Sequence, residues 1–237
     1  MLFIDTFGKS HYPVQGMFCI MISIEHGTAG SMKLMIKICG ITRIEDALFA
    51  TELGASAVGF VFYPKSPRYI EPEAAGEISS ALPGHIVRIG VFVDEDERTV
   101  LDIVKEAHLT AVQLHGNEDR GYIDRLGGLR VIKAVRIGPD FDEKTLADYS
   151  TGTFLVDAYS STAHGGTGIT VDWNVAHRLG RYGRIILAGG LNASNVREAV
   201  ETARPWGVDV SSGVEVGPGV KDHDKLRAFF HALNGFV

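Results

Sequence analysis

Hydrophobic positions along residues 33–237 alternate between two periods. Short apolar runs of strand length are each followed by a segment in which apolar residues recur every three or four positions, as in an amphipathic helix. This alternation is typical of a parallel sheet with crossover helices. The expected strands are 34–39, 57–62, 86–93, 111–115, 130–136, 153–157, 185–188 and 208–211. The expected helices are 43–53, 72–82, 97–108, 118–126, 143–148, 173–179, 193–203 and 222–233.

Eight βα units in residues 33–237 predict a single α/β domain, a (β/α)8 TIM barrel near the lower end of the size range of that fold. An open doubly wound sheet is the competing architecture, but it seldom needs eight units. Residues 1–32 do not follow the alternation, and a secretory signal would carry a basic region where only Lys9 stands. We expect residues 1–32 to be an N-terminal extension, mobile or lying against the barrel.

Composition excludes several classes of protein. The 237 residues are 45% hydrophobic and 22% charged, with a net charge of −6 and no basic run, which argues against a nucleic-acid surface. No apolar window approaches the roughly 20 residues of a membrane helix. Two cysteines make no disulfide framework, so a reducing, cytoplasmic location fits. No spacing typical of metal ligands and no nucleotide-binding motif is found, so the sequence supports neither a metal site nor nucleotide binding.

The last two expected strands each end in a glycine-containing turn. Gly189 and Gly190 follow strand 185–188, with Asn192 as the expected N-cap of the next helix, and Ser212 and Gly213 follow strand 208–211. Backbone N–H groups left unpaired in such turns, next to helix N-termini, favour an anion. In (β/α)8 barrels a phosphate site lies after strands seven and eight, although the glycines could serve tight turns alone.

Catalytic groups in a barrel lie at the carboxyl ends of the strands. Cys39 and Asp157 end strands one and six, and His115 ends strand four. Alternation turns Lys37 inward together with Cys39, and Asp209 of strand eight is its expected partner across the closing seam. Taken singly, a cysteine is more often a small buried hydrophobe and a histidine more often part of the scaffold. Their common location favours a site.

Two loops complete this candidate site. The loop 63–70 after strand two contains two prolines that limit its freedom, so Arg68 could be held as a carboxylate clamp rather than as an exposed arginine. The loop 158–170 after strand six contains three glycines among small polar residues. That composition suits a lid that closes over a ligand, with an ordinary flexible loop as the alternative.

Six motifs, in one order along residues 36 to about 230, together resemble the phosphoribosylanthranilate isomerase family. They are Lys37–Thr42, Ser66–Ile70, Val112–Gly116, Leu155–Asp157 with Gly165–Gly168, Leu187–Leu191 and Asp209–Glu215. The resemblance implies a (β/α)8 enzyme of tryptophan biosynthesis. Its reaction is an Amadori rearrangement, which converts N-(5′-phosphoribosyl)anthranilate into 1-(2-carboxyphenylamino)-1-deoxyribulose 5-phosphate. The N-terminal extension departs from the family, whose members usually begin at strand one.

The resemblance also implies roles for individual residues. Asp157 matches the general acid that opens the ribose ring, and Cys39 the general base that takes the proton from C2′. Arg68 matches the residue that binds the anthranilate carboxylate. Asp209 matches a residue that lies near the ribose and the anthranilate amine, and His115 matches a residue that lines the site. Gly190, Ser212 and Gly213 match the phosphate cradle. The family includes monomers and homodimers.

Two further expectations concern protonation. We expect Lys37 to lower the pKa of the Cys39 thiol, and burial beside the lid to raise the pKa of Asp157.

The sequence leaves three alternative functions open. The related isomerase of histidine biosynthesis carries an acid where Cys39 stands, and indole-glycerol-phosphate synthase needs a catalytic lysine at the rim, two residues beyond Lys37. A barrel that binds a sugar phosphate without turnover is the third, and the matched acid and base disfavour it.

Overall fold

The computed structural model describes residues 33–138, 141–158 and 173–236 of the 237-residue chain. The expected N-terminal extension, residues 1–32, therefore lies outside the described residues. So does the expected lid from residue 159 onward. No helix within the described ranges is long and apolar enough to cross a membrane.

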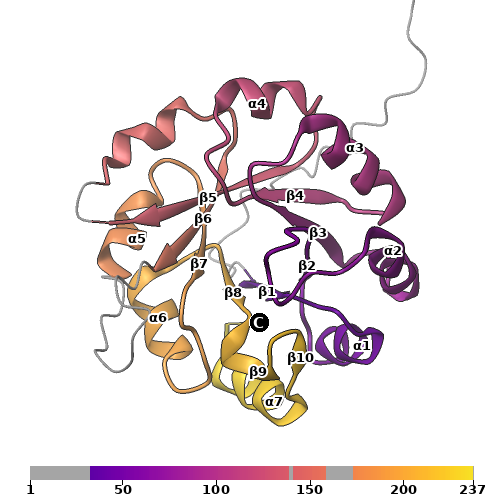
Figure 1. Ribbon diagram of the computed structural model, residues 1–237. Helices are drawn as coiled ribbons and strands as arrows, with labels where there is room; N and C mark the ends of the chain where they lie inside the picture. Colours follow the sequence, from indigo (N-terminus) through magenta and orange to yellow (C-terminus); the bar gives the residue numbers. More distant parts are fainter. Residues whose placement is uncertain (1–32, 139–140, 159–172, 237) are drawn as a thin grey trace, which may run out of the picture. The chain divides into compact units, whose positions relative to one another are not determined.

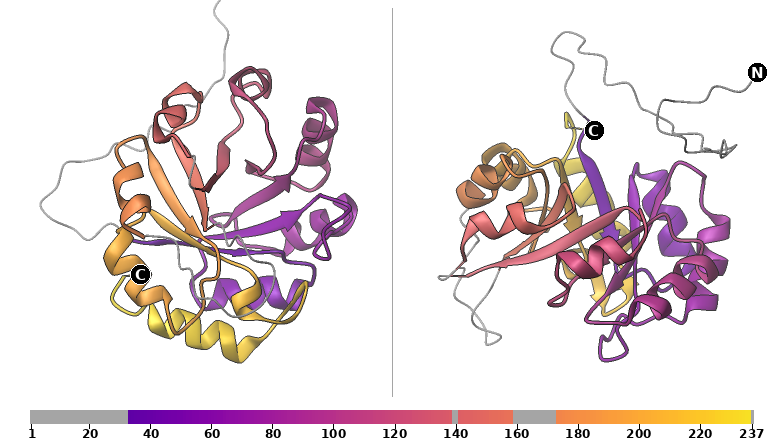
Figure 2. Two further views of the ribbon diagram at one scale, coloured as in Figure 1. Left: turned by 60° about the vertical axis from the view of Figure 1, so that its left-hand side comes forward. Right: turned by 90° about the horizontal axis from the view of Figure 1, so that it is seen from above.

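Within these residues, eight parallel strands close into a barrel in the order of the chain, and the helices lie outside the ring of strands (Figures 1 and 2). The predicted (β/α)8 barrel is confirmed. The strands of the barrel are β1 (Met35–Cys39), β2 (Ala57–Val61), β3 (Val87–Phe92), β4 (Ala111–Leu114), β5 (Val131–Ile137), β6 (Thr153–Ala158), β7 (Arg184–Ala188) and β8 (Gly207–Val210).

The connecting helices agree with the predicted segments to within a few residues. They are α1 (Ile44–Glu52), α2 (Pro72–Ala81), α3 (Glu97–Glu106), α4 (Arg120–Arg125), the 3-10 helix η1 (Glu143–Asp148), α5 (Trp173–Leu179), α6 (Val196–Ala203) and α7 (His223–Ala232).

Pairing of the first strand with the last closes the barrel. Ile36 of β1 lies opposite Val208 of β8, and Lys37 lies opposite Asp209. Because side chains alternate along a strand, this register sends Ile36 outward to the helices and Lys37 into the barrel.

The core has two parts. Between strands and helices lie large side chains such as Ile36, Ile38 and Phe60, all fully buried. Inside the barrel, the side chains are a separate cluster that includes Ala57, Ala111, Ala134, Leu155 and Ile186. Small residues there leave room for longer polar side chains nearer the carboxyl ends of the strands. The interior of the barrel is therefore filled by apolar side chains toward the amino ends of the strands and is polar toward their carboxyl ends.

Two local features differ from the sequence prediction. Helix α6 begins at Val196 rather than at 193, because Asn192 forms a turn: its side chain accepts from Ser194 N–H at 2.8 Å and its carbonyl from Val196 N–H at 3.0 Å. Asn192 is thus not the N-cap. After β8, the 3-10 turn η2 (Ser212–Val214) leads into a hairpin of β9 (Glu215–Gly217) and β10 (Val220–Lys221) before α7 begins. The sequence analysis missed this hairpin.

Candidate active site

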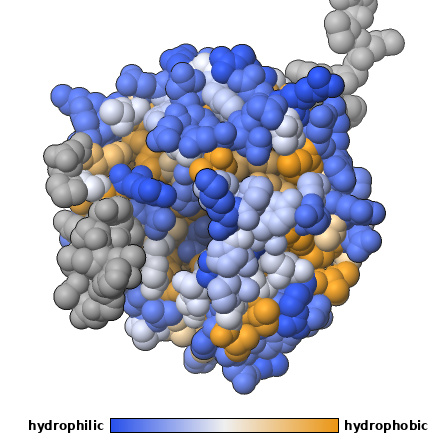
Figure 3. Space-filling model, viewed as in Figure 1, coloured by the Kyte–Doolittle hydropathy of each residue, from blue (hydrophilic) through white to orange (hydrophobic). Residues whose placement is uncertain are grey.

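A cavity of about 590 Å³ opens at the carboxyl ends of the barrel strands. In the space-filling view, a hollow bordered by hydrophilic residues opens near the centre of this face (Figure 3). All eight predicted site residues line the cavity: Cys39, Arg68, His115, Asp157, Gly190, Asp209, Ser212 and Gly213. The structure therefore brings together residues from β1, β6 and β8 and from four loops.

Cys39 and Lys37 both point into the barrel, and the neighbouring strand gives them space. Gly59 of β2 pairs with Cys39, and a Cβ at Gly59 would lie 2.9 Å from Cys39 Sγ and 3.0 Å from Lys37 Cε. Burial raises the pKa of the thiol, and the nearby Lys37 ammonium lowers it by less. The expected effect of Lys37, which is to lower the pKa of the thiol, is confirmed, but burial outweighs it and the pKa of Cys39 is raised overall.

Lys37 is fully buried, and its ammonium group donates hydrogen bonds to two side chains. Its Nζ donates to Asp209 Oδ2 and to Gln113 Oε1, both at 2.9 Å. Burial lowers the pKa of Lys37, but the Asp209 carboxylate outweighs burial and raises it. The predicted partnership across the β1–β8 seam is confirmed. The other oxygen of Asp209 and the hydroxyl of Ser211 are buried without a protein partner among the described residues, and both residues line the cavity.

Gln113 fixes the protonation of His115. Because Lys37 can only donate, Gln113 turns Oε1 toward it and presents Nε2 to His115 Nδ1 at 3.0 Å. Nδ1 must then accept, so the ring proton of the neutral histidine is on Nε2, 3.8 Å from Asp157 Oδ2. Burial, with the charges of Lys37 and Arg136, lowers the pKa of His115. His115 is accordingly a neutral donor that faces Asp157.

Asp157 combines partial burial with access to the cavity. Its side chain is 33% exposed at the end of β6. Burial and the Asp209 carboxylate raise its pKa, while Arg136 lowers it by less. The predicted direction of the shift is confirmed, and this carboxyl has the environment that a general acid needs.

Arg68 is held in place at the cavity wall. Its loop follows β2, and its backbone N–H donates to Ser66 Oγ at 3.1 Å. Its Nη2 lies 2.6 Å from Glu215 Oε2, and its Nε lies 3.0 Å from Oε1 of the same carboxylate. The guanidinium is therefore an ordered group and not a solvated loop arginine.

The two glycine turns lie against each other. A Cβ at Gly213 would lie 1.9 Å from the Leu191 carbonyl oxygen, so only glycine allows this approach. Gly190 has φ +64°, which glycine adopts without strain. Packing of the turns after β7 and β8 brings their backbone groups to one side of the cavity, as a phosphate cradle requires.

Sequence analysis missed three polar residues of the site: Gln113 and Arg136, which line the cavity, and Glu215, which binds Arg68. Gln113 falls in the quoted motif Val112–Gly116 but was not named as a site residue, and Arg136 and Glu215 were not singled out. Glu215 lies in the quoted motif Asp209–Glu215, and a Gly-Pro-Gly turn at 217–219 was the signal for its hairpin.

A family model described as N-(5'phosphoribosyl)anthranilate (PRA) isomerase matches residues 36–232. The chain belongs to the phosphoribosylanthranilate isomerase family. The N-(5'-phosphoribosyl)anthranilate isomerase of Thermotoga neapolitana is 49% identical over 202 residues, which are 84% of this chain and 98% of the relative.

Solved structures of phosphoribosylanthranilate isomerases share the fold. One, in complex with reduced 1-(o-carboxyphenylamino)-1-deoxyribulose 5-phosphate, has a TM-score of 0.76 and 43% identity. It covers 85% of this chain and 99% of its own. A second, of monomers generated from the dimeric enzyme of Thermotoga maritima, has the same TM-score, identity and coverage.

Proposed function

We propose that this chain catalyses the Amadori rearrangement of N-(5′-phosphoribosyl)anthranilate with Asp157 as general acid and Cys39 as general base. The isomerase activity, a step of tryptophan biosynthesis, follows from membership of the family. The observation that carries the residue assignment is the placement of a carboxyl with a raised pKa and a buried thiol in one cavity.

In the first step, Asp157 donates a proton to the ring oxygen of the ribose. The C1′–O bond then breaks and the amine nitrogen supplies the electrons of the Schiff base. The raised pKa of Asp157 supports this role, because it increases the fraction of the acid form. His115, neutral with its proton on Nε2, can donate to the carboxylate that the transfer leaves behind.

In the second step, the Cys39 thiolate takes the proton from C2′. The electrons of that C–H bond form the C1′–C2′ double bond of an enolamine, and the electrons of the C1′–N double bond return to nitrogen. Protonation at C1′, with loss of the proton from the C2′ hydroxyl, then yields the ketone. The Lys37 ammonium stabilises the thiolate, although burial keeps the pKa of the thiol above its ordinary value. Both steps are proton transfers, so we propose a reaction without metal or other cofactor.

The remaining residues bind substrate. Arg68 takes the carboxylate of the anthranilate, and the unpartnered oxygen of Asp209 accepts from the amine or a ribose hydroxyl. Gly190, Ser212 and Gly213 cradle the phosphate.

Several broader expectations join the proposal. We infer a cytoplasmic protein that uses a small phosphoribosyl substrate and not nucleic acid, consistent with the net charge of −6. It is a monomer or a homodimer, and one solved relative is described as dimeric. Residues 1–32 form an extension that leaves the chemistry of the barrel 33–237 unchanged.

The test is to form phosphoribosylanthranilate in situ and to follow the loss of its fluorescence after the full chain is added. Rapid loss, with the deoxyribulose phosphate identified by mass and by reduction, supports the isomerase. If the chain instead turns over only the phosphoribosyl amine of histidine biosynthesis, or binds without turnover, the proposal is wrong.

A further inference from the structure

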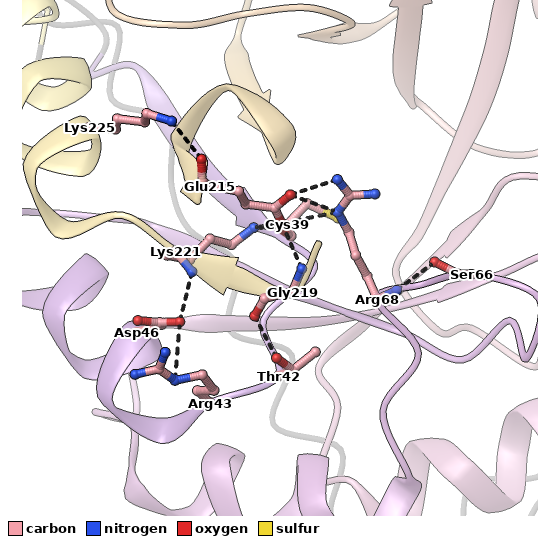
Figure 4. Close-up of polar contacts among 10 residues, drawn as sticks. All are labelled: Cys39, Thr42, Arg43, Asp46, Ser66, Arg68, Glu215, Gly219, Lys221 and Lys225. Carbon is pink, nitrogen blue, oxygen red and sulfur yellow. Dashed lines mark hydrogen bonds and ion pairs between the residues drawn. The ribbon is translucent and has the colours of Figure 1, made fainter. Parts of the chain in front are cut away.

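Glu215 lies between two cations, Lys221 and Arg68, and Arg68 lines the cavity. Its side chain is 4% exposed, and its carboxylate accepts from Arg68 on one side and from Lys221 Nζ, at 2.7 Å, on the other (Figure 4). Burial raises the pKa of this carboxyl, but the hydrogen bonds from Arg68 and Lys221 outweigh burial and hold the pKa below its ordinary value. Glu215 is therefore a buried carboxylate that two cations hold in its charged form.

The carboxylate uses one edge of the Arg68 guanidinium. Nε and Nη2 both donate to it, at 3.0 and 2.6 Å. A guanidinium has five donors in a fixed fork, so the edge formed by Nη1 and the second hydrogen of Nη2 is left for another acceptor. That second edge has the geometry for a bidentate contact with a carboxylate. Glu215 and a ligand carboxylate can thus bind Arg68 at the same time.

On the side away from Glu215, the Arg68 side chain packs against the backbone of Gly40. Gly40, directly after Cys39, has φ +71°, and a Cβ there would lie 2.6 Å from Arg68 Cδ. The arginine stem therefore crosses the backbone of Gly40, while its head is bonded to Glu215. These two contacts restrict the orientation of the guanidinium.

The hairpin that carries Glu215 is hydrogen-bonded to the end of β1, to the loop that follows and to the first turn of α1. Lys221 Nζ donates to the Cys39 carbonyl at 2.5 Å, and Lys221 N–H donates to Asp46 Oδ2 at 3.0 Å. Thr42 Oγ1 donates to the Gly219 carbonyl at 2.6 Å. Figure 4 shows these contacts as one network around Lys221 and Glu215. The group that orients Arg68 thus belongs to the same rigid unit as the backbone of the thiol.

We propose that Glu215 is a positioning residue for substrate recognition: it orders the Arg68 guanidinium so that its open edge meets the aromatic carboxylate of the substrate. The inference rests on the proposed function, in which Arg68 binds that carboxylate. Glu215 itself touches no substrate atom. Its contribution is pre-organisation, because a flexible arginine loses side-chain freedom on binding and an ordered one does not.

The experiment compares two stable ligands, amino-pentitol 5-phosphates that carry either a 2-carboxyphenyl or a phenyl group on nitrogen. Their inhibition constants are measured with wild type, Glu215→Gln, Arg68→Met and the double variant. We expect Glu215→Gln to weaken the carboxyphenyl ligand about tenfold and to leave the phenyl ligand unchanged, and to have no further effect in the Arg68→Met background. Glu215→Asp, which keeps the charge, restores part of the preference.

Lys225→Met is the matched control. Its Nζ donates to the Glu215 carbonyl at 2.7 Å, so this variant perturbs the same hairpin without touching the carboxylate. We expect it to keep the wild-type preference. Equal weakening of both ligands by Glu215→Gln, or further weakening in the Arg68→Met background, would overturn the inference while leaving the isomerase standing. If Arg68→Met itself leaves the preference unchanged, the proposed role of Arg68 is wrong, and with it that of Glu215.

Discussion

Lys37 Nζ lies 2.9 Å from Asp209 Oδ2 in the closing seam of the barrel, in direct register between β1 and β8. A buried lysine is costly without such a partner, and removal of one member of a buried pair costs about 3–5 kcal/mol. The pair also sets the field around Cys39, because the lysine lowers the pKa of the thiol and the aspartate raises it.

These opposite effects predict opposite changes in thiol reactivity. Lys37→Met should slow the alkylation of Cys39 by iodoacetamide at pH 8, since the pKa of the thiol rises further and the thiolate fraction falls. Asp209→Asn should accelerate it. The measurement is the rate of alkylation against pH under conditions where each variant is folded, with Cys39→Ala to subtract reaction at Cys19. Changes of the same sign in both variants would contradict the electrostatic account.

Asp157→Asn should stabilise the protein while it removes activity. The pKa of Asp157 is raised in the folded state, so its charged form destabilises the fold. That penalty is present above the folded pKa and disappears as the pH falls below the ordinary value of 3.8. We expect a higher urea midpoint for the variant at pH 7, and a difference that shrinks toward pH 4. Turnover should fall by about 10²–10⁴-fold. A variant less stable than wild type at pH 7 would be evidence against this reading.

His115 should be neutral at pH 7 with its proton on Nε2, and its pKa should lie below the ordinary value of 6.5. The reason is that Gln113 presents a donor to Nδ1. Gln113→Glu replaces that donor by an acceptor, so Nδ1 should become protonated and the pKa of the ring should rise. The ¹⁵N chemical shifts of the labelled ring distinguish the forms. Wild-type His115 titrating near pH 6.5, or protonated on Nδ1, would refute the assignment.

Substitution of two glycines with the same backbone conformation distinguishes the effect of backbone strain from the effect on phosphate binding. Gly190 and Gly127 both have φ +64°, and a Cβ at either would meet no atom within 4 Å, but only Gly190 lines the cavity. Alanine at either position should cost about 1–2 kcal/mol of stability through the left-handed backbone. We expect only Gly190→Ala to weaken the binding of inorganic phosphate, measured by calorimetry. Equal phosphate affinity in both variants would count against the cradle.

The barrel, and the position of the eight candidate site residues around one cavity, could be predicted from the chain because the signals are local. Alternation along β1 is enough to turn Lys37 and Cys39 inward, and the strand ends locate Asp157 and the glycine turns. The orientation of these groups depends on contacts between residues far apart in the sequence, which a local pattern cannot reveal. Glu215 meets Arg68 across 147 positions, and Lys221 meets the Cys39 carbonyl across 182.

Protonation states were predicted less well than positions, since they depend on burial. For Asp157, burial and charge act in the same direction, so the expected shift was correct. For Cys39 they oppose each other, and burial outweighs the lysine. The start of α6 was missed for a different reason: the side chain of Asn192 caps its own turn instead of the helix.

The most direct test of the acid and base assignment is the turnover of phosphoribosylanthranilate by wild type, Cys39→Ala, Asp157→Asn and the double variant. Each single variant should lose more than about 10²-fold in kcat/KM, and the double variant should be about as slow as the slower single one, because the two groups act in one reaction. Turnover by either single variant within a few fold of wild type would contradict the assignment.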